Sequence, residues 1–187
     1  MTDIATNKTL VLLSGPVAAG KTSLLKTVGQ HIPLGRISTG WFLRQQVERL
    51  SSEFTRYDLQ EYGDKLDLET NFSWIYWDLV LPYLKDSPDC NLWFLDSVRK
   101  LEQVHCIRSN FEGRVLHVHV TASDDVLSER YLSRGRIEDE NAYTTVGLHS
   151  NEIAARALID VADSVLELSS GPKNREKIES LIENLKV

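Results

Sequence analysis

The sequence predicts an α/β protein, a three-layer α/β/α sandwich built around a five-stranded parallel sheet. Short apolar runs alternate with longer amphipathic stretches, an order that indicates right-handed strand–helix–strand crossovers. The apolar runs lack strict polar alternation, which is typical of parallel strands that are covered on both faces. With 187 residues, the chain suits one domain, residues 1–187, with one sizeable hydrophobic core.

Strands and helices can be assigned from these patterns. The expected strands are residues 10–14, 37–38, 92–95, 115–120 and 165–168. The clearest helical stripe follows the i, i+3, i+4, i+7, i+8 spacing and consists of Phe72, Ile75, Tyr76, Leu79 and Val80. Pro82 then perturbs the last turn of this helix. Residues 134–150 show no clear period, and a stretch of that length in a compact domain is more often a lid or binding loop than a connector.

Composition and charge exclude several classes of protein. The net charge of -6 argues against non-specific binding of nucleic acid, whose phosphates need compensating Lys and Arg. Cys90 and Cys106 lack the paired spacing of a disulfide framework or a structural zinc site. Residues 1–7 lack the apolar core of a signal peptide, and no apolar run approaches the ~20 residues of a membrane span. We therefore expect a cytoplasmic protein, and the sequence leaves its oligomeric state open.

Residues 15–22 decide the class of chemistry. They read G-P-V-A-A-G-K-T and match G-x-x-x-x-G-K-[ST] between an expected strand and an expected helix, 21–30. The two glycines let backbone N–H groups point inward around phosphate oxygens, and the start of the helix adds its positive dipole end. A chance glycine turn is the weaker alternative. The motif predicts a P-loop NTPase fold that binds ATP with Mg²⁺ through Gly15, Pro16, Val17, Ala18, Ala19, Gly20, Lys21, Thr22 and Ser23.

Lys21 and two magnesium ligands complete the predicted donor site. Lys21 supplies a mobile positive charge to the β- and γ-phosphates, and the hydroxyl of Thr22 is expected to bind Mg²⁺. Asp96 directly follows the apolar run 92–95, where a P-loop protein carries the acid that orients the metal's water shell. The alternative for Asp96 is a cap on the helix that begins near Lys100.

Several segments resemble nucleoside monophosphate kinases and their relatives. Residues 37–44, I-S-T-G-W-F-L-R, are similar to I-S-T-G-D-x-L-R of adenylate kinases, which implies that Thr39 and Arg44 hold an acceptor nucleotide; Trp41 stands where that family has Asp. Residues 96–99, D-S-V-R, resemble a D-x-x-R segment of viral deoxynucleotide kinases and animal phosphomevalonate kinases, and the resemblance implies that Arg99 binds the acceptor's phosphate.

The same resemblance extends to the lid. Arg130, Arg134 and Arg136 in E-R-Y-L-S-R-G-R look like the arginines that open the lid of such kinases. Independently of any family, phosphoryl transfer needs positive charge on both the donor and acceptor sides. We assign Arg99 and Arg134, with Lys21, to catalysis and Arg130 to the ATP site. For each arginine a surface salt bridge is the competing interpretation.

For several other motifs, a structural role is the first interpretation. His117 and His119 share one face of a strand and are expected to be hydrogen-bonded core residues rather than metal ligands. Residues 57–70 are charged and helix-prone, either a solvated helix or a flap on the acceptor side. Trp74 and Trp77 are expected to pack in the core, with stacking on an acceptor base as the alternative.

Taken with the resemblance, the motifs predict an ATP-dependent phosphotransferase. The expected acceptor is a small molecule, most simply a nucleoside monophosphate or nucleoside. A sugar, a phosphorylated isoprenoid precursor or a modified base is the second possibility, and a regulatory P-loop ATPase is the third. We find neither the D-x-x-G nor the N-K-x-D motif of switch GTPases.

Overall fold

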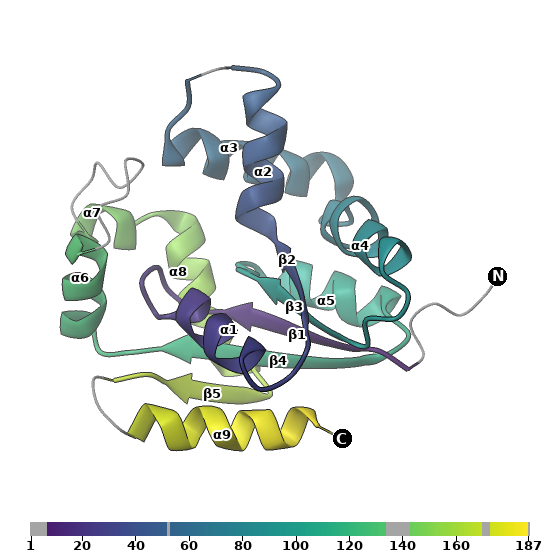
Figure 1. Cartoon of the computed structure of the whole chain (residues 1–187). Coiled ribbons are helices and arrows are strands. Elements are labelled where there is room, and N and C mark those ends of the chain that lie inside the picture. Colours follow the sequence, from purple (N-terminus) through teal and green to yellow (C-terminus); the bar gives the residue numbers. More distant parts are fainter. Residues whose placement is uncertain (1–6, 52, 134–142, 170–172, 187) are drawn as a thin grey trace.

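The computed structural model describes residues 7–51, 53–133, 143–169 and 173–186 (Figure 1). The expected strands pair in one parallel sheet in the order β2-β3-β1-β4-β5. Their bounds are β1 (Thr9–Ser14), β2 (Gly35–Ser38), β3 (Leu92–Asp96), β4 (Arg114–Thr121) and β5 (Ser164–Glu167). The predicted α/β/α class and P-loop NTPase fold are confirmed.

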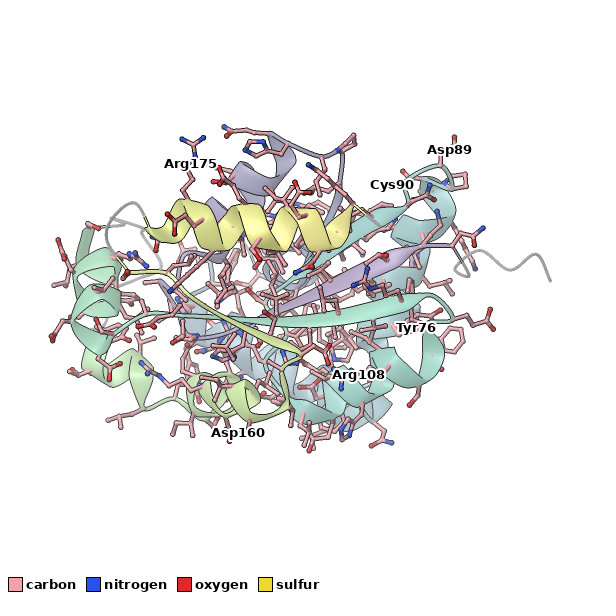
Figure 2. The ribbon with its side chains drawn as sticks, turned by 90° about the horizontal axis from the view of Figure 1, so that it is seen from below. Tyr76, Asp89, Cys90, Arg108, Asp160 and Arg175 are labelled. Carbon is pink, nitrogen blue, oxygen red and sulfur yellow. The ribbon has the colours of Figure 1, made fainter. Side chains whose placement is uncertain are left out.

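Helices cover both faces of this sheet. In chain order the helical elements are α1 (Lys21–Gly29), α2 (Thr39–Glu48), α3 (Arg56–Thr70), η1 (Ile75–Val80), α4 (Leu81–Asp86), α5 (Leu101–Asn110), α6 (Asp124–Ser133), α7 (Tyr143–Gly147), α8 (Ser150–Ala157), η2 (Leu158–Val161) and α9 (Lys173–Leu185). Viewed from below, α9 lies on one side of the sheet and α5 and α8 lie on the other (Figure 2).

The sheet divides the hydrophobic core into two clusters. Val11 and Leu13 of β1 pack with α1, α6 and α9, whereas Leu10 and Leu12 pack with η1, α4 and α5. All four side chains are fully buried. A strand that buries both of its faces shows no polar alternation, which is why β1 reads in the sequence as a continuous apolar run.

The helix predicted over the 72–80 stripe differs from the expectation. It begins with a π-helical turn, η1, and continues directly into α4, where Pro82 lies in the first turn. Since η1 runs directly into α4, Pro82 lies inside one continuous helical segment, where its missing N–H removes a possible intrahelical bond. Within this segment Trp74 is buried, as expected, but Trp77 is 52% exposed, so its predicted core packing is wrong.

Two helices extend beyond the carboxyl edge of the sheet. α2 follows β2 without a loop, and α3 crosses beside it (Figure 1). Ser38 caps α2 by accepting the N–H of Trp41, and Thr55 and Asp58 form a capping box at the start of α3. Among the described residues, no helix has the length and apolar character needed to cross a membrane.

Candidate active site

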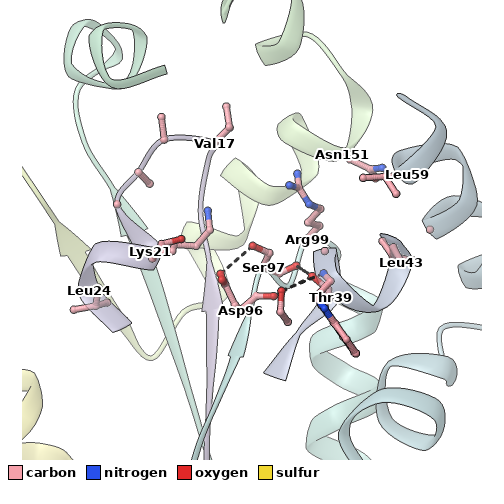
Figure 3. Close-up of a pocket in the computed structure, with 18 of the residues that line it drawn as sticks. Val17, Lys21, Leu24, Thr39, Leu43, Leu59, Asp96, Ser97, Arg99 and Asn151 are labelled. Carbon is pink, nitrogen blue, oxygen red and sulfur yellow. Dashed lines mark hydrogen bonds between the residues drawn. The ribbon is translucent and has the colours of Figure 1, made fainter. Parts of the chain in front are cut away.

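A cavity of about 870 Å³ lies at the carboxyl ends of the central strands. Its lining comes from the P-loop and α1, from α2 and α3, and from the turn between β3 and α5. In open parallel sheets, ligands bind at this edge, where the strand order reverses. The cavity therefore extends from the predicted donor loop to the helices predicted to hold the acceptor (Figure 3).

The P-loop geometry explains both of its glycines. Gly15 has φ +118° and lies so close to β4 that a Cβ would stand 1.9 Å from the carbonyl oxygen of Val120. Gly20 has φ +100° and directly precedes α1. Ala18 also lies in the left-handed region, with φ +64°. Only glycine fits at position 15, and the resulting loop aims its backbone at the cavity.

Lys21 folds over the P-loop. Its Nζ donates to the carbonyl oxygens of Gly15 (2.6 Å) and Pro16 (2.8 Å). Thr22 and Ser23 follow in the first turn of α1 and line the same cavity. The predicted donor residues are thus brought together, and their roles toward ATP stay predictions.

Asp96 ends β3 opposite Leu13, the residue that precedes Ser14 and the P-loop. Its carboxylate accepts hydrogen bonds from Arg36 Nη2 (2.8 Å) and Ser97 Oγ (3.0 Å). The alternative role as a helix cap is not supported, because the N-cap of α5 is Lys100 and the Asp96 carboxylate bonds to Arg36 and Ser97 instead. The hydroxyl of Thr22 and the carboxylate of Asp96 both line the cavity, and this oxygen donor set fits Mg²⁺.

The turn after Asp96 is strained and fixed to its neighbours. Ser97 has φ +75°, which is uncommon for a residue with a side chain. Its N–H bonds to Leu13 O at 3.1 Å, and Thr39 Oγ1 donates to Asp96 O at 2.9 Å. Thr39, expected to contact the acceptor, is itself buried at the start of α2. Its hydroxyl joins β3 to α2 in the described structure.

Arg99 lines the cavity just after the turn that follows Asp96. Its side chain occupies the space between Val17 of the P-loop and Asn151 of α8 (Figure 3). Arg99 Nη1 donates to Glu152 Oε1 at 2.5 Å, and Arg56 Nη2 donates to the same oxygen at 3.0 Å. The sequence did not point to Glu152, which lies in the first turn of α8 and reaches the site only because the folded chain brings α8 against the P-loop.

Glu152 is an ionised carboxylate in a buried position. Burial alone would raise its pKa, but the charge and hydrogen bond of Arg99, the N–H of Val17 and the charge of Arg56 outweigh it and lower the pKa to about 2. The Val17 N–H bonds to Oε2 at 2.9 Å. The site thus holds a permanent negative charge between donor loop and arginines.

The remaining predicted arginines have different surroundings. Arg44 lines the cavity on α2, with its guanidinium 5.4 Å from the centre of the Phe54 ring. Arg130 lies beside the P-loop and donates to the carbonyl oxygens of Leu168 (3.0 Å) and Ser169 (3.3 Å). Arg134 and Arg136 lie outside the described residues, as does 134–142 of the predicted lid, so the lid stays a prediction.

One face of α3 forms the cavity wall opposite the P-loop. Its lining residues are Arg56, Leu59, Gln60, Gly63, Asp64 and Asp67. Their helical spacing puts them on one stripe, a signal that the sequence contains but that the charged character of 57–70 obscured. The segment is helical and one face of it lines the cavity, whereas its role as a flap on the acceptor side stays a prediction.

Lys100 joins this wall to α5. Its Nζ bonds to Asp64 (2.5 Å) and Asp67 (2.8 Å), and the buried Asp67 also accepts the indole N–H of Trp74 at 2.7 Å. Trp74 stacks on Phe42 with ring centres 5.4 Å apart, so it is both a core residue and part of the cavity wall. The sequence does not indicate this polar cluster, because its members come from three separate segments.

The histidine pair lies beneath the P-loop. Ser14 Oγ contacts His117 Nε2 at 2.7 Å and His119 Nδ1 at 2.9 Å, and both rings are buried. Burial, with the nearby His117 and Lys21, lowers the pKa of His119 to about 4. The expectation of hydrogen-bonded core histidines is confirmed, and the described residues contain no His, Cys, Asp and Glu cluster suited to a metal.

Sequence similarity to known proteins shows the family to which this chain belongs. Adenylate kinase 1 from Nostoc sp. is 30% identical over 136 residues, which cover 70% of this chain and 72% of the relative. The chain belongs to the P-loop nucleotide kinase superfamily. No family model matches it.

This P-loop kinase also has neighbours of the same fold. A sugar kinase from Janibacter sp. superimposes with a TM-score of 0.57 at 18% identity, covering 97% of this chain and 95% of the other. Shikimate kinase from Bacteroides thetaiotaomicron gives 0.55 at 15% identity, covering 96% and 99%. The protein is a phosphotransferase, an ATP-dependent kinase of a small molecule.

Proposed function

We propose that this kinase transfers the γ-phosphoryl group of ATP, with Mg²⁺, to a nucleoside monophosphate. The observation that carries the proposal is the charge of the cavity. Among the described residues, its lining includes seven cationic side chains against three carboxylates, those of Asp64, Asp67 and Asp96, and the buried Glu152 bonded to Arg56 and Arg99 adds a fourth negative charge. The cationic residues are Lys21, Arg36, Arg44, Arg56, Arg99, Lys100 and Arg130.

Such an excess of positive charge is unexpected in a chain of net charge -6. It suits two phosphorylated substrates, because the phosphates of ATP and a phosphate on the acceptor each need compensating positive charge. A neutral acceptor brings no phosphate of its own and would need fewer cations. The adenylate kinase relative, which covers the larger part of the chain, supports a nucleotide as acceptor.

Each side of the cavity has a distinct task in this proposal. The P-loop N–H groups and the start of α1 bind the ATP phosphates, and Lys21 turns from its carbonyl partners to the γ-phosphate. Thr22 and Asp96 hold Mg²⁺, which when bound neutralises charge on the β- and γ-phosphates. Arg130 contacts ATP from the side of β5.

The acceptor side orients the attacking phosphate. Arg99 binds the acceptor's phosphate as a planar fork, and Arg44 supports it from α2. Thr39, at the start of α2, positions the turn between β3 and α5 through its bond to Asp96 O. The chain's task is alignment and charge stabilisation, since a phosphate acceptor needs no strong general base.

A sugar or similar polyhydroxy acceptor is the second candidate. Asp64 retains partial exposure on the cavity wall, and a carboxylate there can accept hydroxyl hydrogen bonds. The two structural neighbours named above are a sugar kinase and a shikimate kinase.

The test is ADP release with ATP and Mg²⁺ across nucleoside monophosphates, the matching nucleosides, and sugars. We expect turnover with at least one nucleoside monophosphate and much slower turnover with its nucleoside. Turnover confined to nucleosides or sugars would contradict the proposal and favour the second candidate. ADP release that no acceptor stimulates would indicate an ATPase.

A further inference from the structure

Glu152 makes a set of contacts that differs from an ordinary salt bridge. One of its oxygens receives Arg99 and Arg56, and the other receives the backbone N–H of Val17. The side chain is only 1% exposed. A single buried carboxylate therefore connects the donor loop to two cationic residues of the acceptor side.

The two arginines need such a partner. Both guanidinium groups bond to the same oxygen, so they lie close together, where like charges repel. A buried carboxylate between them offsets that repulsion and fixes the direction of each planar group. Arg56 and Arg99 nevertheless line the cavity and keep 19% and 28% of their side chains exposed.

Glu152 is itself held rigidly. It lies in the first turn of α8, whose N-cap is His149. The neighbouring Asn151 donates to Asp64 of α3 at 3.0 Å, and the His149 ring packs edge-on against Tyr57. α8 is thus fixed to α3 on one side and to the P-loop on the other.

We propose that Glu152 is a positioning residue that holds Arg56 and Arg99 as a paired site for the acceptor's phosphate. The Val17 bond fixes this pair relative to the P-loop and hence to the γ-phosphate of ATP. Arg56, which the sequence did not single out, becomes a second arginine for that phosphate. This inference rests on the proposed function, because it requires a phosphorylated acceptor.

Glu152→Gln tests the inference. Glutamine keeps the length of the side chain and an oxygen for Val17, but it removes the charge and turns N–H groups toward the guanidinium groups. The matched control is Glu179→Gln, which removes an exposed glutamate–arginine pair on α9. Calorimetric binding of ATP, of a nucleoside monophosphate and of its nucleoside is measured for each, together with KM and kcat.

We expect the monophosphate to bind Glu152→Gln at least about tenfold more weakly, with a matching rise in its KM, since charged hydrogen bonds are lost. ATP and nucleoside affinities should change little, and Glu179→Gln should match the wild type. An unchanged monophosphate affinity, or a fall in kcat that is equal for all acceptors, would mean a structural role and overturn the inference. Tighter monophosphate binding would also overturn it, because Glu152 would then compete with the substrate for the arginines.

A second variant covers the case in which Glu152→Gln does not fold. Arg56→Lys keeps the charge but not the planar fork, and we expect weaker monophosphate binding with unchanged nucleoside binding. Equal monophosphate binding by Arg56→Lys and wild type would overturn the inference. If the wild-type protein binds no nucleoside monophosphate, both the proposed function and the inference are overturned. If the wild type binds the monophosphate and the variants bind it equally well, the inference alone is overturned.

Discussion

At the scale of single residues, the P-loop combines a steric requirement with a mobile charge. Gly15 cannot carry a side chain, because β4 lies directly against it. Lys21, by contrast, is a partly buried side chain whose bonds go to two loop carbonyls. Its removal leaves the loop backbone in place, so its charge can be tested separately from the fold.

Lys21→Ala should lower kcat by roughly a thousandfold or more, because the charge facing the developing γ-phosphate is lost. Circular dichroism and the melting temperature should remain close to those of the wild type. Lys26→Ala, at the exposed end of the same helix, is the control and should keep full turnover. Near-normal turnover in a folded Lys21→Ala protein would exclude the P-loop assignment.

At the scale of helices and strands, the sequence was most informative where burial is complete. β1 and β3 carry uninterrupted apolar residues, and both were assigned correctly. The π turn of η1 could not be foreseen, since its apolar spacing differs little from that of an α-helix. The cavity face of α3 was hidden because charged residues on a helix usually face water.

Asp67 shows how these elements depend on one another. It lies on α3 and accepts hydrogen bonds from Trp74, which precedes η1, and from Gln103 of α5, besides its ion pair with Lys100. Only 2% of its surface is exposed. Its loss leaves buried donors without an acceptor.

We expect Asp67→Ala to lower the free energy of unfolding by about 2–4 kcal/mol, the cost of breaking a buried polar network. Urea unfolding followed by tryptophan fluorescence measures this, since Trp74 reports directly on the network. Asp78→Ala, on the exposed face of η1, is the matched control. Equal stabilities of the two variants would argue against Asp67 as the junction.

At the scale of the whole molecule, charge is distributed unevenly. The chain is acidic, yet seven of its 21 Lys and Arg residues line the cavity at one edge of the sheet. The P-loop, Asp96 and Arg99 could be predicted from short motifs, because each lies at the end of a strand or within a few residues after it. Glu152 and Arg56 could not, since only the folded chain brings α8 and α3 against the P-loop.

The central claim is that the cavity takes a phosphorylated acceptor, and Arg99→Ala kinetics on a nucleoside monophosphate and its matching nucleoside test it most directly. We expect kcat/KM for the monophosphate to fall by the equivalent of about 2–4 kcal/mol, while the nucleoside reaction and ATP affinity change little. Equal, small effects on both acceptors would contradict the account and leave only an ATP-dependent kinase of another small molecule.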